Sequence, residues 1–235
     1  MLNRKVDAYS SYLVVQLLKT VKQSMDYKAL SKQTGLPVST LTRYLTNKTL
    51  PRGKRTLELI DRLLKIVNLN VIIQQRLAID DHEVDISEIV SESYLVELMV
   101  AQMLKDLAGS RIDCLLAFDR AGLIIATAFG LSTMKKVYYT LNTETTAAKK
   151  WVEIKYRNRE SRTLSRLYVP VDVLKSHVLL TTGILDGFVP LKEILAKISE
   201  AKGDLVGIAA VASSKEFLKS LKPYQYGKII SFGSF

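Results

Sequence analysis

Several side chains between residues 38 and 54 are of the types that contact DNA. Arg43 can donate a pair of hydrogen bonds to guanine, and Val38 can pack against a thymine methyl group. Ser39 and Thr42 can make polar contacts with bases or phosphates. A further group of hydroxyl and basic side chains is placed to anchor phosphates: Thr40, Thr46, Lys48, Arg52 and Lys54. Together these residues predict a segment that inspects base edges, followed by a loop that grips the DNA backbone.

To present these side chains, the chain needs two short helices joined by a tight turn, and the stretch Asp26 to Leu45 has that pattern. Gly35 permits a sharp turn, and Pro37 fixes φ where the second helix begins. Leu41 and Leu45 are four residues apart and therefore face the same side of that helix. The pattern predicts a helix-turn-helix motif whose second helix enters the major groove. A plain helical hairpin is the alternative.

The distribution of charge favours the DNA interpretation. Residues 1–66 contain 13 Lys/Arg and 4 Asp/Glu, a net charge of +9, whereas residues 67–235 contain 21 and 19, a net charge of +2. A compact basic module on a nearly neutral body is typical of a DNA-binding head on a second domain. Helices over 8–22 and 56–67 are predicted to complete this head. We therefore place a domain boundary after residue 67, with a linker near 67–72.

Composition excludes several other classes of protein. No run of 18 apolar residues exists, so no transmembrane helix is expected and we predict no membrane partner. The N-terminus lacks a cleavage site of small residues, and the single cysteine, Cys114, suits a reducing interior, so a cytoplasmic protein is expected. His82 has four acidic neighbours but no second His or Cys, which is typical of a solvated loop. We predict no metal site.

The first part of the body is predicted to connect the head to a sheet. Residues 70–79 are rich in β-branched side chains and predict a strand, and residues 80–87 predict an acidic turn. Residues 87–108 predict one long helix that is apolar over much of its circumference. Such a helix is either deeply buried or used between subunits. We therefore expect a homodimer.

From residue 112 onwards, apolar strands alternate with helices. Strands are predicted over 112–118, 134–141, 176–183 and 204–213, helices over 123–131 and 188–201, and a basic β-hairpin within 143–168. The alternation predicts an α/β body with a mostly parallel sheet and right-handed crossovers. The expected fold class is therefore α+β with two domains, an all-α domain over 1–67 and an α/β domain over 68–235. The basic hairpin at 149–166 is predicted to touch DNA, to close over a ligand or to face solvent.

Two stretches of the body, AFDRAG before LIIATAFG and later VLLTTGILDGFVPLKEIL, resemble type I phosphoribosyltransferases, particularly the orotate group. In that family the first turn binds pyrophosphate, and the later loop holds the 5-phosphate of phosphoribosyl pyrophosphate with backbone N–H groups. Two adjacent carboxylates there hold the ribose hydroxyls. Gly187 falls on the loop glycine, Thr181 and Thr182 stand in place of the two acids, and Val189 stands in place of a threonine.

The resemblance implies a ligand site made of Thr181, Thr182, Gly183, Asp186, Gly187, Val189 and Arg120. Two glycines and a following helix N-terminus in 182–189 suit a phosphate, although any strand-to-helix turn shares this pattern. Threonines carry no charge, and losing preorganised carboxylates typically costs several kcal/mol of transition-state stabilisation. We therefore expect no enzyme activity and no cofactor, with phosphoribosyl pyrophosphate or a nucleotide as an effector.

The layout as a whole is similar to that of archaeal regulators in which a helix-turn-helix head, here about 8–66, precedes a phosphoribosyltransferase-like body, here about 110–212. We therefore predict a homodimeric, sequence-specific transcription regulator that binds double-stranded DNA. Its body would sense a small phosphorylated effector. The alternative is an active phosphoribosyltransferase of nucleotide metabolism with an appended DNA-binding head.

Overall fold

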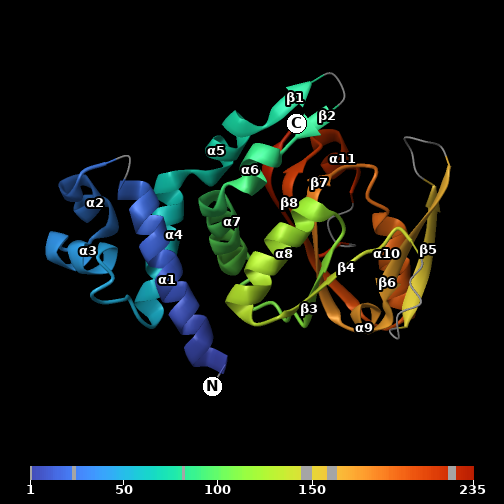
Figure 1. Cartoon of the computed structure of the whole chain (residues 1–235), viewed down its shortest axis with the longest axis horizontal. Helices are drawn as coiled ribbons and strands as arrows, with labels where there is room; N and C mark the ends of the chain where they lie inside the picture. The colour runs from blue at the N-terminus through green and yellow to red at the C-terminus, as the bar shows by residue number, and fades with distance from the viewer. Residues whose placement is uncertain (1, 23–24, 81–82, 144–149, 158–162, 222–225) are drawn as a thin grey trace.

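The computed structural model describes residues 2–22, 25–80, 83–143, 150–157, 163–221 and 226–235 (Figure 1). Its first four helices are α1 (Leu2–Lys22), α2 (Tyr27–Thr34), α3 (Val38–Leu45) and α4 (Lys54–Val67). They lie together at one end of the molecule, away from the sheet (Figure 1). None of the helices in these described ranges is both long enough and apolar enough to cross a membrane.

The turn between α2 and α3 forms where the sequence predicts it. Asp26 caps α2, because its carboxylate accepts a hydrogen bond from Ala29 N at 2.7 Å. Gly35 ends α2 with φ of 71°, a left-handed conformation that glycine adopts without strain. Arg62 of α4 donates from Nη1 to Thr34 O at 2.8 Å, which ties the end of α2 to the fourth helix. The positions of these helices are confirmed, while their binding to DNA stays a prediction.

The segment after α4 differs from the prediction. Residues 70–79 were expected to form a strand, and this prediction is wrong because α5 (Leu69–Arg76) follows α4 after a single left-handed residue, Asn68. Asn68 lies within 67–72, where a linker between domains stays a prediction. The fully buried Ile73 packs in the core that contains Phe232, and α5 lies against β9 (Lys228–Ser234). This tertiary contact overrides the strand preference of the β-branched residues.

The hairpin that follows α5 is made of β1 (Ala78–Asp80) and β2 (Glu83–Asp85), which pair antiparallel. The expected long helix is two helices, α6 (Ser87–Ser91) and α7 (Ser93–Asp106), separated by extended backbone at Glu92. Helix α7 is apolar around most of its surface because α1, α4 and α8 (Arg120–Thr133) pack on it. Burial within its own chain therefore explains the pattern, and a homodimer stays a prediction.

The body contains a five-stranded sheet in the order β4-β3-β7-β8-β9, with every neighbouring pair parallel. Besides β9, its strands are β3 (Cys114–Ala117), β4 (Lys136–Tyr139), β7 (His177–Leu185) and β8 (Asp204–Ser213). The predicted mostly parallel α/β sheet is confirmed. A separate antiparallel hairpin is formed by β5 (Trp151–Arg157) and β6 (Leu164–Pro170), as the sequence predicts.

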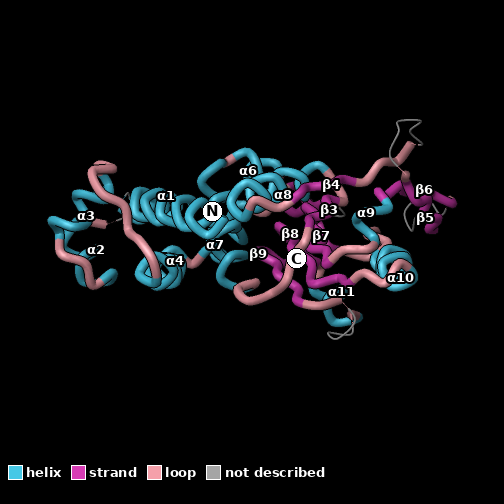
Figure 2. The backbone as a smooth tube through the Cα atoms, turned by 90° about the horizontal axis from the view of Figure 1, so that it is seen from below, coloured by secondary structure: helices cyan, strands magenta, loops and turns pink. Residues whose placement is uncertain are grey.

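Helices cover both faces of the sheet (Figure 2). On one face, a continuous apolar core runs from the first four helices through α7 and α8 to β9. On the other face, the core includes α9 (Val171–Leu174), α10 (Leu191–Glu200) and the hairpin, with α11 (Lys215–Ser220) packed against it. The head and body thus share a core across residue 67, where the sequence suggested a boundary. The division into functional domains at that residue stays a prediction.

Candidate functional site at the carboxyl edge of the sheet

The candidate site lies where β3 and β7 end. In open α/β sheets, ligands bind in the crevice beyond the carboxyl ends of the strands. Because β3 and β7 are neighbours and parallel, the turns at 118–120 and 186–190 that follow them lie at the same edge. Each turn leads into a helix, α8 and α10 respectively, so two helix N-termini also lie at this edge.

Asp119 organises the first turn. Its carboxylate caps α8 by accepting from Gly122 N at 2.6 Å. The same carboxylate accepts from Thr182 Oγ1 at 2.6 Å and from Gly183 N at 2.9 and 3.0 Å. These bonds join the start of α8 to β7 across more than sixty positions of sequence. The sequence prediction missed Asp119, although an aspartate just before a helix is a signal for a helix cap.

The side chains of Thr181 and Thr182 are fully buried. Thr181 donates from Oγ1 to Gly122 O at 2.9 Å, so both threonines hold α8 against the strand. Gly122 allows this close packing, because a Cβ at that position would lie 2.4 Å from Thr181 O. A Cβ at Gly183 would likewise lie 2.7 Å from Ala121 Cβ. The structure brings these predicted ligand residues together, but it uses them for packing.

The second turn carries the other predicted ligand residues. Asp186 and Gly187 are half-buried, and Val189 is buried. Burial raises the pKa of Asp186, an effect opposed by the hydrogen bond that its Oδ1 accepts from Phe188 N at 2.8 Å and reinforced by the charge of Asp119. Arg120 lies at the start of α8 with its side chain exposed. The carboxyl edge therefore offers one accessible guanidinium, one carboxylate with a raised pKa and a glycine-containing turn.

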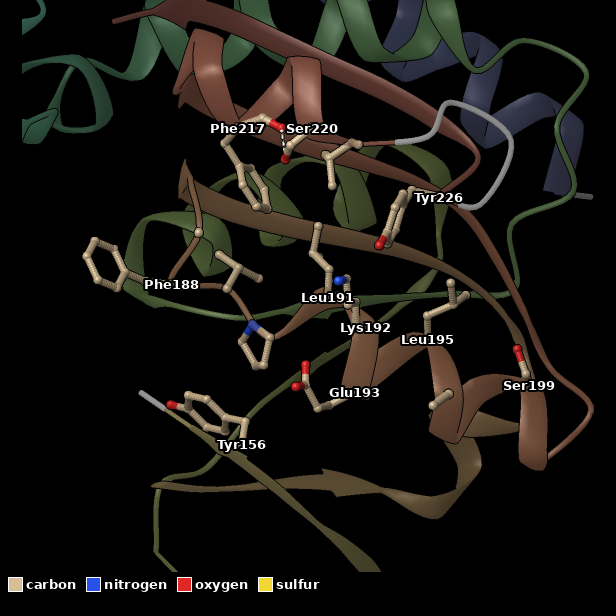
Figure 3. Close-up of a pocket in the computed structure, with 15 residues that line it drawn as sticks. Tyr156, Phe188, Leu191, Lys192, Glu193, Leu195, Ser199, Phe217, Ser220 and Tyr226 are labelled. Atoms are coloured by element: carbon tan, nitrogen blue, oxygen red, sulfur yellow. Dashed lines mark hydrogen bonds between the residues drawn. The ribbon is translucent and has the colours of Figure 1, made fainter. Parts of the chain in front are cut away.

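A cleft of about 840 Å³ adjoins the second turn and runs along α10 (Figure 3). It is bounded by residues 187–191, by Tyr156 of β5, and by Phe217 and Leu221 in and after α11. Tyr226 closes one side. No sequence pattern predicted this cleft, because its walls come from three separate parts of the chain.

The predicted DNA-contact residues lie mostly on the surface. Val38 is 41% exposed, and Ser39, Thr42, Arg43, Thr46, Lys48 and Arg52 are also exposed. Thr40 is half-buried, and Lys54 is the first residue of α4. Thr42 Oγ1 donates to Val38 O at 2.9 Å and Thr46 Oγ1 to Thr42 O at 2.7 Å. The outward face of α3 thus presents Val38, Ser39 and Arg43 together, without a carboxylate.

The described residues contain no group of three or more metal-ligating side chains that could hold an ion. His82, which we considered as a ligand in the acidic segment, lies outside the described residues, as does Asp81. The sequence prediction of no metal site therefore stays a prediction.

No protein-family model matches this sequence, and no curated protein matches it either. Solved structures do match. An adenine phosphoribosyltransferase from Rhodothermus marinus has a TM-score of 0.60 at 12% identity, over 72% of this chain and 99% of the other. That from Thermoanaerobacter pseudethanolicus has a TM-score of 0.58 at 13% identity, over 71% and 99%. That from Trypanosoma brucei, in complex with AMP, pyrophosphate and ribose-5-phosphate, has a TM-score of 0.57 at 11% identity, over 71% and 79%.

The likeness shows a phosphoribosyltransferase fold over most of the chain. The fold resembles that of adenine phosphoribosyltransferases, whereas the sequence pattern suggested the orotate group. The matched structures are enzymes, and this finding contradicts our expectation that the chain is not one. That expectation rested on Thr181 and Thr182 being substituted active-site residues. Their side chains are buried in the packing of α8 on β7, so their lack of charge says little about a ligand at this edge.

Proposed function

We propose that the chain is a phosphoribosyltransferase of nucleotide metabolism with a DNA-binding head. The proposal is supported mainly by the two strand-to-helix turns, 118–120 and 186–190, which lie side by side at the carboxyl edge of the parallel sheet. The sheet belongs to a phosphoribosyltransferase fold. Phosphoribosyl pyrophosphate would bind across this edge. Its 5-phosphate would lie against the backbone N–H groups of the second turn and the N-terminus of α10.

In the proposed reaction, a ring nitrogen of a nucleobase attacks C1 of the ribose. The bond between C1 and the pyrophosphate oxygen breaks, pyrophosphate leaves with the bonding electrons, and the N–H proton of the base passes to an acceptor. That acceptor would be solvent water, because Asp186 lies in the turn proposed to hold the 5-phosphate and its Oδ1 accepts from Phe188 N at 2.8 Å. Arg120, exposed at the first turn, would neutralise charge on the leaving pyrophosphate.

The test is to incubate the purified chain with phosphoribosyl pyrophosphate and each common nucleobase in turn and to measure pyrophosphate. We expect release with one class of base, and a loss of roughly 10²-fold or more in kcat for Arg120→Ala, which removes the charge proposed to stabilise the leaving pyrophosphate. Lys175→Ala is the charge-matched control, because Lys175 is exposed just after α9, away from the turn. Absence of pyrophosphate above the rate without protein, for every base, would refute the transferase proposal.

The second part of the proposal is that α2 and α3 bind double-stranded DNA. It is supported by the exposed face of α3, which presents Val38, Ser39 and Arg43 on a head with a net charge of +9 over residues 1–66. Arg43 would donate hydrogen bonds to a guanine, which would favour guanine over another base by about 1–3 kcal/mol of binding free energy. In a homodimer, two such heads would contact half-sites about one helical turn apart.

Selection of bound sequences from random duplex DNA tests this part. We expect a defined site, affinity that falls steeply with salt, and a relaxed preference after Arg43→Ala. Lys175→Ala is the charge-matched control, since Lys175 is exposed in the body. Sedimentation with and without the selected duplex would give the number of chains per site. No binding to duplex DNA at low salt would end the proposal for the head.

A further inference from the structure

Helix α8 has an uncharged outer face that the described part of the chain leaves uncovered. From Ala121 to Met134 the sequence contains no Asp, Glu, Lys or Arg. The inner side of α8 packs on β3, β7 and α7, whereas Ile124 is 41% exposed and Leu131 is 70% exposed. Figure 1 shows α8 at the front of the molecule. A helix that is apolar on all sides is normally buried on all sides, so a partner is expected to cover this face.

The exposed residues of α8 follow the spacing of a seam between two paired helices. Ile124, Thr127, Leu131 and the capping Met134 are separated by three, four and three residues, and all four are exposed. Side chains at this spacing lie on one face of a helix and can interdigitate with those of a second helix. The middle of the seam is small, because Thr127 is followed by the half-buried Ala128. Small side chains there allow two helices to approach closely.

This seam is complementary to itself. Ile124 and Leu131 lie at equal distances along α8 on either side of the midpoint between Thr127 and Ala128. If two copies of α8 pair antiparallel about a two-fold axis at that midpoint, Ile124 of one copy meets Leu131 of the other. The symmetry makes this contact twice. The two large side chains are therefore placed to bury each other without a third kind of surface.

One end of the seam adjoins acidic side chains of α6 and β2. The start of α6 lies beside the first turn of α8, because a Cβ at Gly183 would be 2.7 Å from both Ile86 Cδ1 and Ala121 Cβ. Asp85 and Glu88 are close to Ile86 in sequence, and both are exposed. This end of the seam thus carries two negative charges.

The opposite end of the seam is basic. Lys135 and Lys136 follow α8 directly and are exposed, with a charge of +2. Arg120 is exposed at the acidic end, so the two carboxylates and one guanidinium there sum to −1. Antiparallel pairing brings the acidic end of each copy to the basic end of the other, whereas parallel pairing would bring like charges together.

We propose that the outer face of α8 is the interface at which two copies of this chain form a two-fold symmetric dimer. The seam contributes an apolar centre, Ile124 and Leu131 of each copy, and the charged ends set the antiparallel direction. Helix α7, in contrast, is covered within its own chain by α1, α4 and α8. The interface goes beyond both activities proposed above and depends on neither.

Sedimentation velocity of the full chain over a series of protein concentrations, without DNA or phosphoribosyl pyrophosphate, measures the association. We expect the wild type to dimerise. Leu131→Lys should raise the dissociation constant of the dimer by at least about 100-fold, because each dimer carries the change twice and each loss is about tenfold. Leu57→Lys is the matched control and should leave the constant unchanged, since Leu57 is 60% exposed on α4. Circular dichroism checks that both variants fold.

A cysteine cross-link tests the arrangement of the two helices. The chain has a single cysteine, Cys114, and it is buried, so an introduced thiol is the accessible one. Thr127→Cys should form a covalent dimer on oxidation, because residue 127 lies next to the proposed axis. Met134→Cys should not, because a rise of about 1.5 Å per residue puts the two copies of residue 134 roughly 20 Å apart, too far for a disulfide.

Three results would overturn the proposal. A wild-type chain that stays monomeric at every concentration would show that α8 has no second copy as its partner. A dimer that Leu131→Lys leaves intact would lie on another face. Cross-linking of Met134→Cys as fast as that of Thr127→Cys would contradict the two-fold axis at the middle of α8. DNA binding and pyrophosphate release do not enter these measurements, so this interface can fail while either proposed activity stands.

Discussion

Asp119 and Asp26 offer a paired test of what holds the carboxyl edge together. Both are helix caps, and each accepts a hydrogen bond from a backbone N–H three residues later, at 2.6 Å for Asp119 and 2.7 Å for Asp26. Only Asp119 also accepts from Thr182 Oγ1 and Gly183 N on β7. The difference between Asp119→Ala and Asp26→Ala therefore measures the bonds that join α8 to the strand.

The structure gives the expected size of that difference. Asp26→Ala removes one exposed cap and should cost about 1 kcal/mol of unfolding free energy. Asp119→Ala removes a similar cap and two further charged hydrogen bonds, and it leaves the N–H of the buried Gly183 without a partner. Since Asp119 is only half-buried, the loss of each further hydrogen bond should cost about 1 kcal/mol. Asp119→Ala should therefore lower the free energy of unfolding by about 3 kcal/mol in total.

Urea unfolding at pH 7, followed by circular dichroism, measures both variants against the wild type. Thr182→Val should cost about 1 kcal/mol, because it keeps the side-chain shape and removes the hydroxyl. The double variant with Asp119→Ala should be less destabilised than the sum, since both changes remove the same hydrogen bond. Equal losses for Asp119→Ala and Asp26→Ala, with unchanged m-values, would show that the link to β7 does not stabilise the fold.

Two further predictions concern the sheet. The hydrogen bond from the His177 side chain lowers the pKa of Asp113 to about 2, and the bond from His177 N adds to this effect. Because the pKa of Asp113 in the unfolded chain is about 3.9, this pair should stabilise the fold above that pH and lose its effect as the pH falls towards 2. The stability gap between wild type and Asp113→Asn, measured by urea unfolding from pH 7 to pH 2, should therefore close below pH 4; a constant gap would refute this. Gly122→Ala should cost more than about 2 kcal/mol, because the new Cβ would lie 2.4 Å from Thr181 O, whereas Thr127→Ser on the exposed face of the same helix should stay within about 0.5 kcal/mol in the same assay.

Local patterns in the sequence determined much of the secondary structure. Leu41 at helical spacing, the left-handed Gly35 and the Asp26 cap are short-range features, so α2, α3 and their turn follow from a few neighbouring residues. The continuous apolar runs of β3, β7 and β8 likewise predicted a sheet buried on both faces. These elements depend on backbone preferences and side-chain period, which are visible in the chain itself.

The tertiary structure alone decided which of the predicted ligand residues are accessible at the carboxyl edge of the sheet. Thr181 and Thr182 look like ligand residues by position, but the close approach of α8, permitted by Gly122, buries them. Asp119 joins residues more than sixty positions apart, and no spacing rule connects them. Residues 69–76 became a helix because Ile73 packs in the core behind β9. In each case the outcome is decided by a contact between segments that are distant in sequence, and a local sequence pattern does not contain that information.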